Sequence, residues 1–135
     1  MLKAGVIGAG HLGKIHLKLL QQSSKYELVG FYDDNHEVAE KVEQEFGYKR
    51  FSTIEELIKA VEVVSVVTPT ISHFEMAKKV ITSGKHLFIE KPITQTVTEA
   101  EKIRDLAKQH NVRGQVGQVE RFNPAFRAIK DKISN

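Results

Sequence analysis

Residues 2–13, with the sequence LKAGVIGAGHLG, decide the fold of this 135-residue chain. The apolar run Leu2–Ile7 predicts a short buried strand. Gly8, Gly10 and Gly13 follow it in the pattern G-x-G-x-x-G, and apolar residues then recur at helical spacing. A strand, a glycine-rich turn and a helix in this order are typical of a dinucleotide-binding α/β fold.

Each glycine of this loop has a separate expected role. Gly8 permits the tight turn, Gly10 lets a pyrophosphate approach the backbone, and Gly13 lets the helix pack closely on the strand. Because free N–H groups at a helix start attract anions, we predict that His11 and Leu12 also contact the pyrophosphate. The alternative is that the loop is only an ordinary turn between a strand and a helix.

An acidic residue completes the fingerprint. Asp33 follows the second predicted strand, Glu27–Tyr32, at the position where a carboxylate accepts hydrogen bonds from the adenosine ribose. Asp34 adds a second negative charge, and no Lys or Arg stands beside the pair to bind a 2′-phosphate. We therefore predict NAD as the cofactor in preference to NADP. The alternative is that Asp33 and Asp34 only cap the next helix.

The rest of the chain alternates between helical and strand patterns. Capping boxes of the form S/T-x-x-E, at Ser52, Ser72 and Thr96, predict helices over 53–60, 73–83 and 97–110. Apolar runs predict further strands over 61–67, 86–90 and 112–119. This alternation predicts an α/β fold, a Rossmann-type, doubly wound parallel sheet of six strands that ends with 112–119.

Two of the later strands end in polar motifs, at the edge where open α/β sheets bind ligands. These motifs are Thr68-Pro-Thr70 and Glu90-Lys-Pro92. The ammonium of Lys91, beside the carboxylate of Glu90, can polarise a carbonyl or assist a proton transfer. From the residues alone, an ion pair that ends the strand before a turn proline explains the second motif equally well.

Three runs, TPTISH at 68–73, SGKH at 83–86 and FIEKP at 88–92, resemble the Gfo/Idh/MocA family, named after glucose-fructose oxidoreductase, inositol dehydrogenase and MocA. With the glycine loop and the acid in order, the resemblance extends from Gly5 to about Phe126. It implies NAD(P)-dependent hydride transfer between the cofactor and a hydroxyl carbon of a sugar, cyclitol or nucleotide sugar. The run VGQVERFNPAF most resembles nucleotide-sugar dehydrogenases of the family.

The resemblance also assigns roles to individual residues. It implies that Lys91 is the catalytic residue, close to the reacting hydroxyl and the nicotinamide. Glu90 would hold the nicotinamide ribose. Thr68, Pro69 and His73 would line the cofactor groove.

The same resemblance implies a domain organisation. Residues 1–120 would form the dinucleotide-binding domain, and residues 121–135 a crossover segment and helix leading to a second α/β domain that is absent. Family members take a catalytic histidine and most substrate contacts from that domain, so we expect this chain to bind NAD without turning over substrate. Exposed apolar surface on the last strand and helix would favour a homo-oligomer.

The composition excludes several other classes of function. The chain has no cysteine, which rules out disulfides and thiol nucleophiles, and its six histidines lack metal-ligand spacing, so we expect no metal site. The 20 basic and 17 acidic residues are interleaved, so we expect no nucleic-acid partner. No apolar stretch is long enough for a membrane span, and no signal peptide precedes the first strand, so we expect a cytoplasmic protein.

Two other functions are compatible with the same fold. A non-catalytic module could sense the NAD/NADH ratio, but such a module needs no ammonium at the end of the fourth strand, where Lys91 stands. A Rossmann domain could also bind another nucleotide, such as S-adenosylmethionine. The ribose acid suits that ligand too, whereas Gly10 and Gly13 favour a pyrophosphate.

Overall fold

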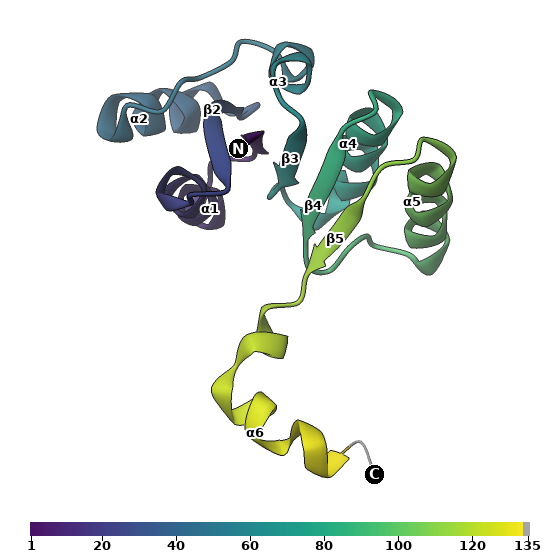
Figure 1. The fold of residues 1–135 in the computed structure, drawn as a ribbon. Coiled ribbons are helices and arrows are strands. Elements are labelled where there is room, and N and C mark those ends of the chain that lie inside the picture. Colours follow the sequence, from purple (N-terminus) through teal and green to yellow (C-terminus); the bar gives the residue numbers. More distant parts are fainter. Residues whose placement is uncertain (134–135) are drawn as a thin grey trace.

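Five parallel strands form the central sheet of the computed structural model, which describes residues 1–133 and the side chains of residues 1–129 (Figure 1). The strands are β1 (Leu2–Ile7), β2 (Tyr26–Tyr32), β3 (Val63–Val66), β4 (His86–Glu90) and β5 (Gly114–Gly117), in the spatial order β2-β1-β3-β4-β5. The helices are α1 (His11–Gln22), α2 (His36–Phe46), α3 (Ile54–Ala60), α4 (Thr70–Thr82), α5 (Val97–Gln109) and α6 (Pro124–Ile133), with a short 3-10 helix, η1 (Val119–Phe122), before α6. The expected parallel α/β architecture is confirmed.

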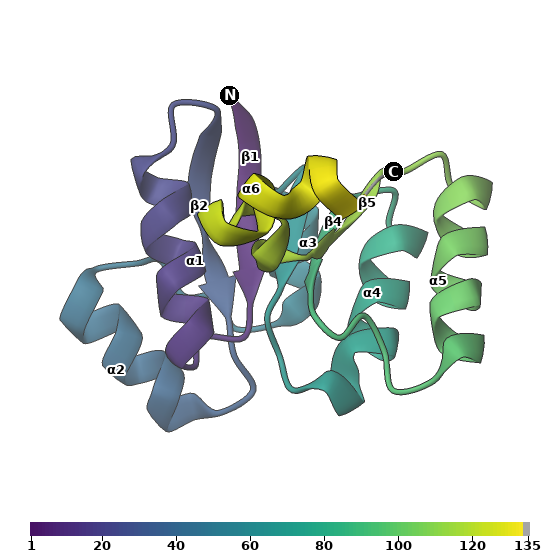
Figure 2. The same ribbon diagram turned by 90° about the horizontal axis from the view of Figure 1, so that it is seen from below.

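Helices cover both faces of the sheet, and each face has its own apolar cluster. On one face, Leu17 of α1 and Val42 of α2 pack with Phe31 of β2, and Figure 2 shows α1 in front of β1 and β2. On the other face, α3, α4 and α5 bury side chains such as Leu57 and Ile81 against the strands. Burial of each such aliphatic side chain contributes about 1.5–3 kcal/mol, which makes these two clusters the main stabilising feature of the fold.

The prediction of six strands is wrong for the described residues, because only five segments have a strand pattern and these five form β1 to β5. The predicted last strand is present as β5. At the opposite edge, Arg50 makes an isolated parallel bridge with Phe31 of β2. The N–H of Phe31 donates to Lys49 O and the N–H of Phe51 donates to Phe31 O, both at 2.9 Å. The start of α3 at Ile54 leaves no further residues to extend this pairing.

The expected capping boxes are present in one case out of three. At α5, the Thr96 hydroxyl accepts from Glu99 N and the Glu99 carboxylate accepts from Thr96 N, so this prediction is confirmed. The cap at Ser72 is wrong, because α4 already begins at Thr70 and the Ser72 hydroxyl instead donates to Thr68 Oγ1 at 2.7 Å. The cap at Ser52 is displaced by one residue, since Thr53 Oγ1 accepts from Glu56 N at 3.2 Å.

The displaced cap of α3 is testable with two neighbouring substitutions. We expect Thr53→Ala to lower the free energy of unfolding by about 1 kcal/mol, because it removes the acceptor for a helix N–H. Ser52→Ala serves as the matched control and should leave stability nearly unchanged. Urea unfolding followed by circular dichroism measures both, and a larger loss for Ser52→Ala would contradict the cap at Thr53.

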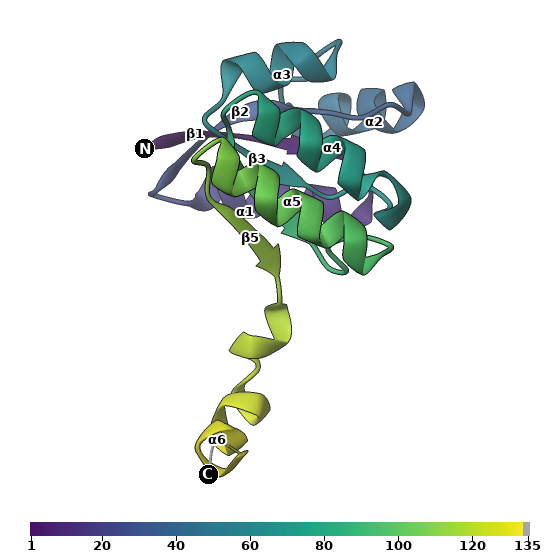
Figure 3. The same cartoon turned by 90° about the vertical axis from the view of Figure 1, so that its right-hand side faces the viewer.

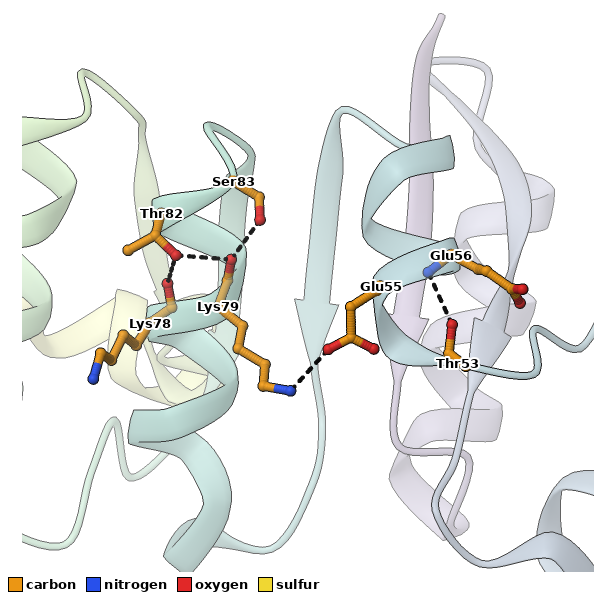
Figure 4. A network of polar contacts seen from close by, with 7 residues as sticks. All are labelled: Thr53, Glu55, Glu56, Lys78, Lys79, Thr82 and Ser83. Atoms are coloured by element: carbon orange, nitrogen blue, oxygen red, sulfur yellow. Dashed lines mark hydrogen bonds and ion pairs between the residues drawn. The ribbon is translucent and has the colours of Figure 1, made fainter.

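One ion pair links α3 to α4 across the surface, and Figure 4 shows it within a small polar network. Lys79 Nζ donates to Glu55 Oε1 at 2.9 Å. This hydrogen bond from Lys79 is the main reason why the pKa of Glu55 lies below its ordinary value. The ion pair therefore contributes to the stability of the fold at neutral pH, and this contribution is lost as the pH falls through the lowered pKa of Glu55. Solvent screening at this exposed site keeps the contribution small.

The last described residues lie apart from the sheet. Figures 1 and 3 show η1 and α6 extending away from the end of β5. Asn123 Oδ1 accepts from Ala125 N at 3.0 Å at the start of α6, whose first residue is Pro124. Phe122, Phe126 and Ile129 are exposed here. Residues 134 and 135 of the predicted crossover segment lie outside the described residues.

Among the described helices, none has the length and hydropathy needed to cross a membrane.

Candidate functional site

A groove of about 770 Å³ runs along the carboxyl ends of the strands. It extends from Asp33 and Asp34 after β2, across the glycine loop after β1, to Glu90 and Lys91 at the end of β4. The chain moves from β1 to β2 in one direction and later crosses to β3 on the other side of β1, so the groove lies where the strand order reverses. This is the place where doubly wound sheets bind their ligands.

Every predicted cofactor-binding residue except Gly13 lines this groove. Gly13 lies behind the loop, in the first turn of α1, where it packs against Gly8. A Cβ on Gly13 would lie 2.0 Å from Gly8 O, so only glycine fits this contact. Gly13 therefore shapes the loop from behind.

The other two glycines of the loop meet different constraints. Gly8 has a φ of +95°, and a Cβ there would lie 2.7 Å from Val67 O, so both backbone conformation and space require glycine. A Cβ on Gly10 would contact nothing within 4 Å. Gly10 is the N-cap of α1 and has no side chain to cap the helix, so the first N–H groups of α1 remain available to an anion. The space above Gly10 belongs to the groove.

The carboxylate of Asp33 ties the end of β2 to the glycine loop. Its Oδ2 accepts from Ala9 N at 2.6 Å, and its Oδ1 accepts from Asn35 N at 2.8 Å. The helix that follows is capped by Asn35, whose side chain accepts from Glu37 N and Val38 N. The alternative that Asp33 and Asp34 are the helix caps is therefore wrong, and Asp33 faces the groove and the loop.

His73 connects the end of β3 to the turn that follows β4 through two hydrogen bonds. Its Nδ1 lies 2.9 Å from Pro92 O and its Nε2 lies 2.8 Å from Thr68 O. Both partners are acceptors, so a neutral ring satisfies one of them and an imidazolium satisfies both. The ring is 1% exposed, which places His73 inside the wall of the groove behind Thr68 and Pro69.

Glu90 is held by a residue that the sequence analysis did not place in the site. Its Oε1 lies 3.0 Å from His16 Nε2, and His16 Nδ1 lies 2.8 Å from Ser65 Oγ. Its Oε2 accepts from the backbone N–H of Lys91 at 3.1 Å. The alternative of an ion pair between the Glu90 and Lys91 side chains is thus not seen among the described side chains, where Glu90 instead interacts with His16 and the exposed Lys91 side chain lies at the groove.

One family model, described as an oxidoreductase family with an NAD-binding Rossmann fold, matches residues 2–118. This chain belongs to the Gfo/Idh/MocA family. The expected resemblance is confirmed, and with it the assignment of the chain as an NAD(P)-binding Rossmann domain.

Curated members of the Gfo/Idh/MocA family match almost the whole chain. It is 34% identical to UDP-N-acetylglucosamine 3-dehydrogenase from Acidithiobacillus ferrooxidans over 96% of its length, and 36% identical to glucose-6-phosphate 3-dehydrogenase from Bacillus subtilis over 100% of its length. The match spans only 41% and 39% of these two relatives. A crystal structure of an NAD-binding protein from Listeria innocua superposes with a TM-score of 0.91 at 30% identity, covering 98% of this chain and 40% of that one.

Sequence reasoning missed Ala9, His16 and Ser65, whose hydrogen bonds hold the two carboxylates of this Gfo/Idh/MocA groove, Asp33 and Glu90. His16 and Ser65 are 49 positions apart, and His16 and Glu90 are 74 positions apart, so no local pattern connects them. The available signal was a histidine on the sheet-facing side of α1, which is ambiguous by itself. Within residues 1–133, no group of three or more potential ligands is placed to hold a metal ion.

Proposed function

We propose that this chain is the NAD-binding domain of a dehydrogenase that acts on a hydroxyl carbon of a sugar, cyclitol or nucleotide sugar. The observation that carries the proposal is the continuous groove that joins Asp33, the glycine loop and Lys91 along one edge of the sheet. Its three parts have the chemistry that a ribose, a pyrophosphate and a reacting hydroxyl each require. The substrate class is supported by relatives named for glucose-6-phosphate, UDP-N-acetylglucosamine and scyllo-inositol.

The charge at the β2 end of the groove supports NAD over NADP. Asp33 and Asp34 both line this end, and Asp33 lies near the loop backbone with its carboxylate partly buried. A 2′-phosphate would bring further negative charge against both carboxylates, and repulsion in a partly dehydrated groove is costly. A free 2′-hydroxyl can instead donate a hydrogen bond to Asp33.

At the other end, Lys91 supports a role in the reaction itself. NAD supplies a hydride acceptor when bound, and oxidation of a carbinol also requires a proton to leave the substrate hydroxyl. The ammonium of Lys91 at the end of β4 stabilises the developing alkoxide electrostatically, whereas its neutral amine form accepts the proton of the hydroxyl. Because the relatives are more than twice as long, we assign the rest of the substrate contacts to parts beyond residues 1–120, with residues 121–135 as the connection.

Calorimetric titration of the chain with NAD and NADP tests this proposal. We expect NAD to bind at least about tenfold more tightly than NADP, and Asp33→Ala to weaken NAD binding about tenfold, because one hydrogen bond to a charged acceptor is lost. Asp33→Asn removes the charge but keeps an acceptor for Ala9 N. It should therefore reduce the difference in affinity between NAD and NADP while disturbing the glycine loop less than Asp33→Ala does.

Asp105→Ala, on the exposed surface of α5, is the matched control and should leave NAD binding unchanged. Equal or tighter binding of NADP would reject the assigned cofactor preference. If the chain bound neither dinucleotide, the proposed function of the chain would be wrong.

A further inference from the structure

We propose that His16 and Ser65 are positioning residues, which hold the Glu90 carboxylate and, through it, the Lys91 backbone at the nicotinamide end of the groove. The inference rests on the proposed function, because it concerns the half of the dinucleotide that carries the nicotinamide. Neither residue is at the glycine loop, and Ser65 lies outside the groove lining.

The hydrogen bonds form a chain with a consistent direction. The Ser65 hydroxyl can donate to His16 Nδ1 at 2.8 Å, and His16 Nε2–H then donates to Glu90 Oε1 at 3.0 Å. The second oxygen of Glu90 accepts from Lys91 N at 3.1 Å. With a neutral imidazole protonated on Nε2, each of these donors therefore has one acceptor. The chain connects α1, β3 and the end of β4.

The surroundings of Glu90 leave its carboxylate little freedom. Its side chain is 7% exposed and that of His16 is 15% exposed, so their hydrogen bond is shielded from water. The ring of Phe88 lies 5.5 Å from the His16 ring and limits its rotation. On β5, a Cβ on Gly117 would lie 2.9–3.0 Å from the Glu90 carboxylate, so glycine leaves the space that the carboxylate occupies.

A carboxylate in this position is not required by the fold alone. An apolar residue at the end of β4 would bury as well, whereas a shielded carboxylate is destabilising unless hydrogen bonds compensate for its lost hydration. The arrangement is explained if the charged carboxylate of Glu90 takes part in ligand binding in the groove. Its bond to Lys91 N also fixes the backbone from which the Lys91 side chain projects.

The order of the strands places this carboxylate at the nicotinamide end. Asp33 marks the adenosine ribose at the end of β2, and the glycine loop after β1 lies next to it. A dinucleotide that crosses the loop must extend its second half over β3 and β4, where Glu90 and Lys91 line the groove. The two halves of the ligand are thus held by separate residues.

This separation makes the inference testable on the 135-residue chain by titration with NAD and with ADP, which lacks both the nicotinamide and the ribose that carries it. We expect His16→Ala to weaken NAD binding about tenfold and to change ADP binding less than about twofold. His16→Gln retains an amide N–H that can reach Glu90, so it should recover most of the NAD affinity. A residue that only stabilises the fold would weaken both ligands together.

A second pair of variants, on β5, tests the position of the same Glu90 carboxylate. Gly117→Ala displaces the Glu90 side chain and should reproduce the selective loss of NAD binding. Gly114→Ala is the matched control on the same strand, because its Cβ would contact nothing within 4 Å. If His16→Ala does not fold, this pair still shows whether NAD binding depends on the position of the Glu90 carboxylate.

The inference is overturned if His16→Ala and Gly117→Ala bind NAD normally, or if they weaken binding of NAD and ADP equally. It is supported if both variants lose affinity for NAD but not for ADP, and if Gly114→Ala binds both ligands normally. If the unsubstituted chain binds neither ligand, the proposed function fails and the inference fails with it. Normal ADP binding by the variants separates these outcomes.

Discussion

Gly13→Ala is expected to lower the free energy of unfolding by about 3 kcal/mol, the largest effect on stability among the substitutions considered. The added Cβ would lie 2.0 Å from Gly8 O and 2.8 Å from Gly8 C. Both atoms belong to the backbone of the loop, so no side-chain rotation can relieve the overlap. The start of α1 must instead move away from β1, which disturbs the apolar cluster around Leu17.

Urea unfolding followed by circular dichroism measures this loss. Gly10→Ala is the matched control, since it changes the same loop at a position where a Cβ meets no other atom within 4 Å. If Gly13→Ala remained within about 0.5 kcal/mol of the unsubstituted chain, close packing of α1 on the loop would not be the reason for a glycine there.

Gly10→Ala is expected to have the opposite profile, with a small loss of stability and a loss of NAD affinity of about thirtyfold. Gly10 has a φ of −62° and a ψ of −163°, an extended conformation that is open to alanine, and alanine in place of glycine at an N-cap costs about 0.5–1 kcal/mol, well below the loss expected for Gly13→Ala. In the groove, however, the methyl group stands where the pyrophosphate must approach the N–H groups of α1. Loss of about 2 kcal/mol of charge-assisted hydrogen bonding corresponds to this change in affinity.

Calorimetry with NAD and ADP tests this second prediction. Both ligands contain the two phosphates, so Gly10→Ala should weaken binding of both by a similar factor, in contrast to the selective effect expected for His16→Ala. Unchanged binding of both ligands would mean that the pyrophosphate does not lie over Gly10. The glycine loop would then be only an ordinary turn between a strand and a helix.

Local patterns were sufficient for most of the fold. The apolar runs and amphipathic segments located all five strands and the helices between them, although the predicted total of six strands was too high, because burial against a sheet imposes that periodicity on each segment separately. The capping box at Thr96 was predictable for the same reason, since its two hydrogen bonds join residues three positions apart. The glycine loop and Asp33 are also short-range signals.

Other features depended on how the segments pack. Ser52 and Thr53 offer similar hydroxyls for a helix cap, and the choice of Thr53 accompanies the burial of Ile54 and Leu57 in the core. The expected number of six strands was wrong because the sequence patterns mark only five strand segments, and the isolated bridge at Arg50, which joins it to Phe31 of β2, has no strand pattern around it.

The amino-acid sequence by itself thus determined the order of strands and helices, the glycine loop and the acid that follows it. These depend on interactions between near neighbours and on the burial pattern of each segment. The tertiary structure alone decided that Asp33 binds the backbone of Ala9, that His73 joins the turns after β3 and β4, and that His16 and Ser65 hold Glu90. Each of these contacts joins segments that become neighbours only when parallel strands align their carboxyl ends, and the direction of a hydrogen bond across such a distance is not encoded in any local pattern.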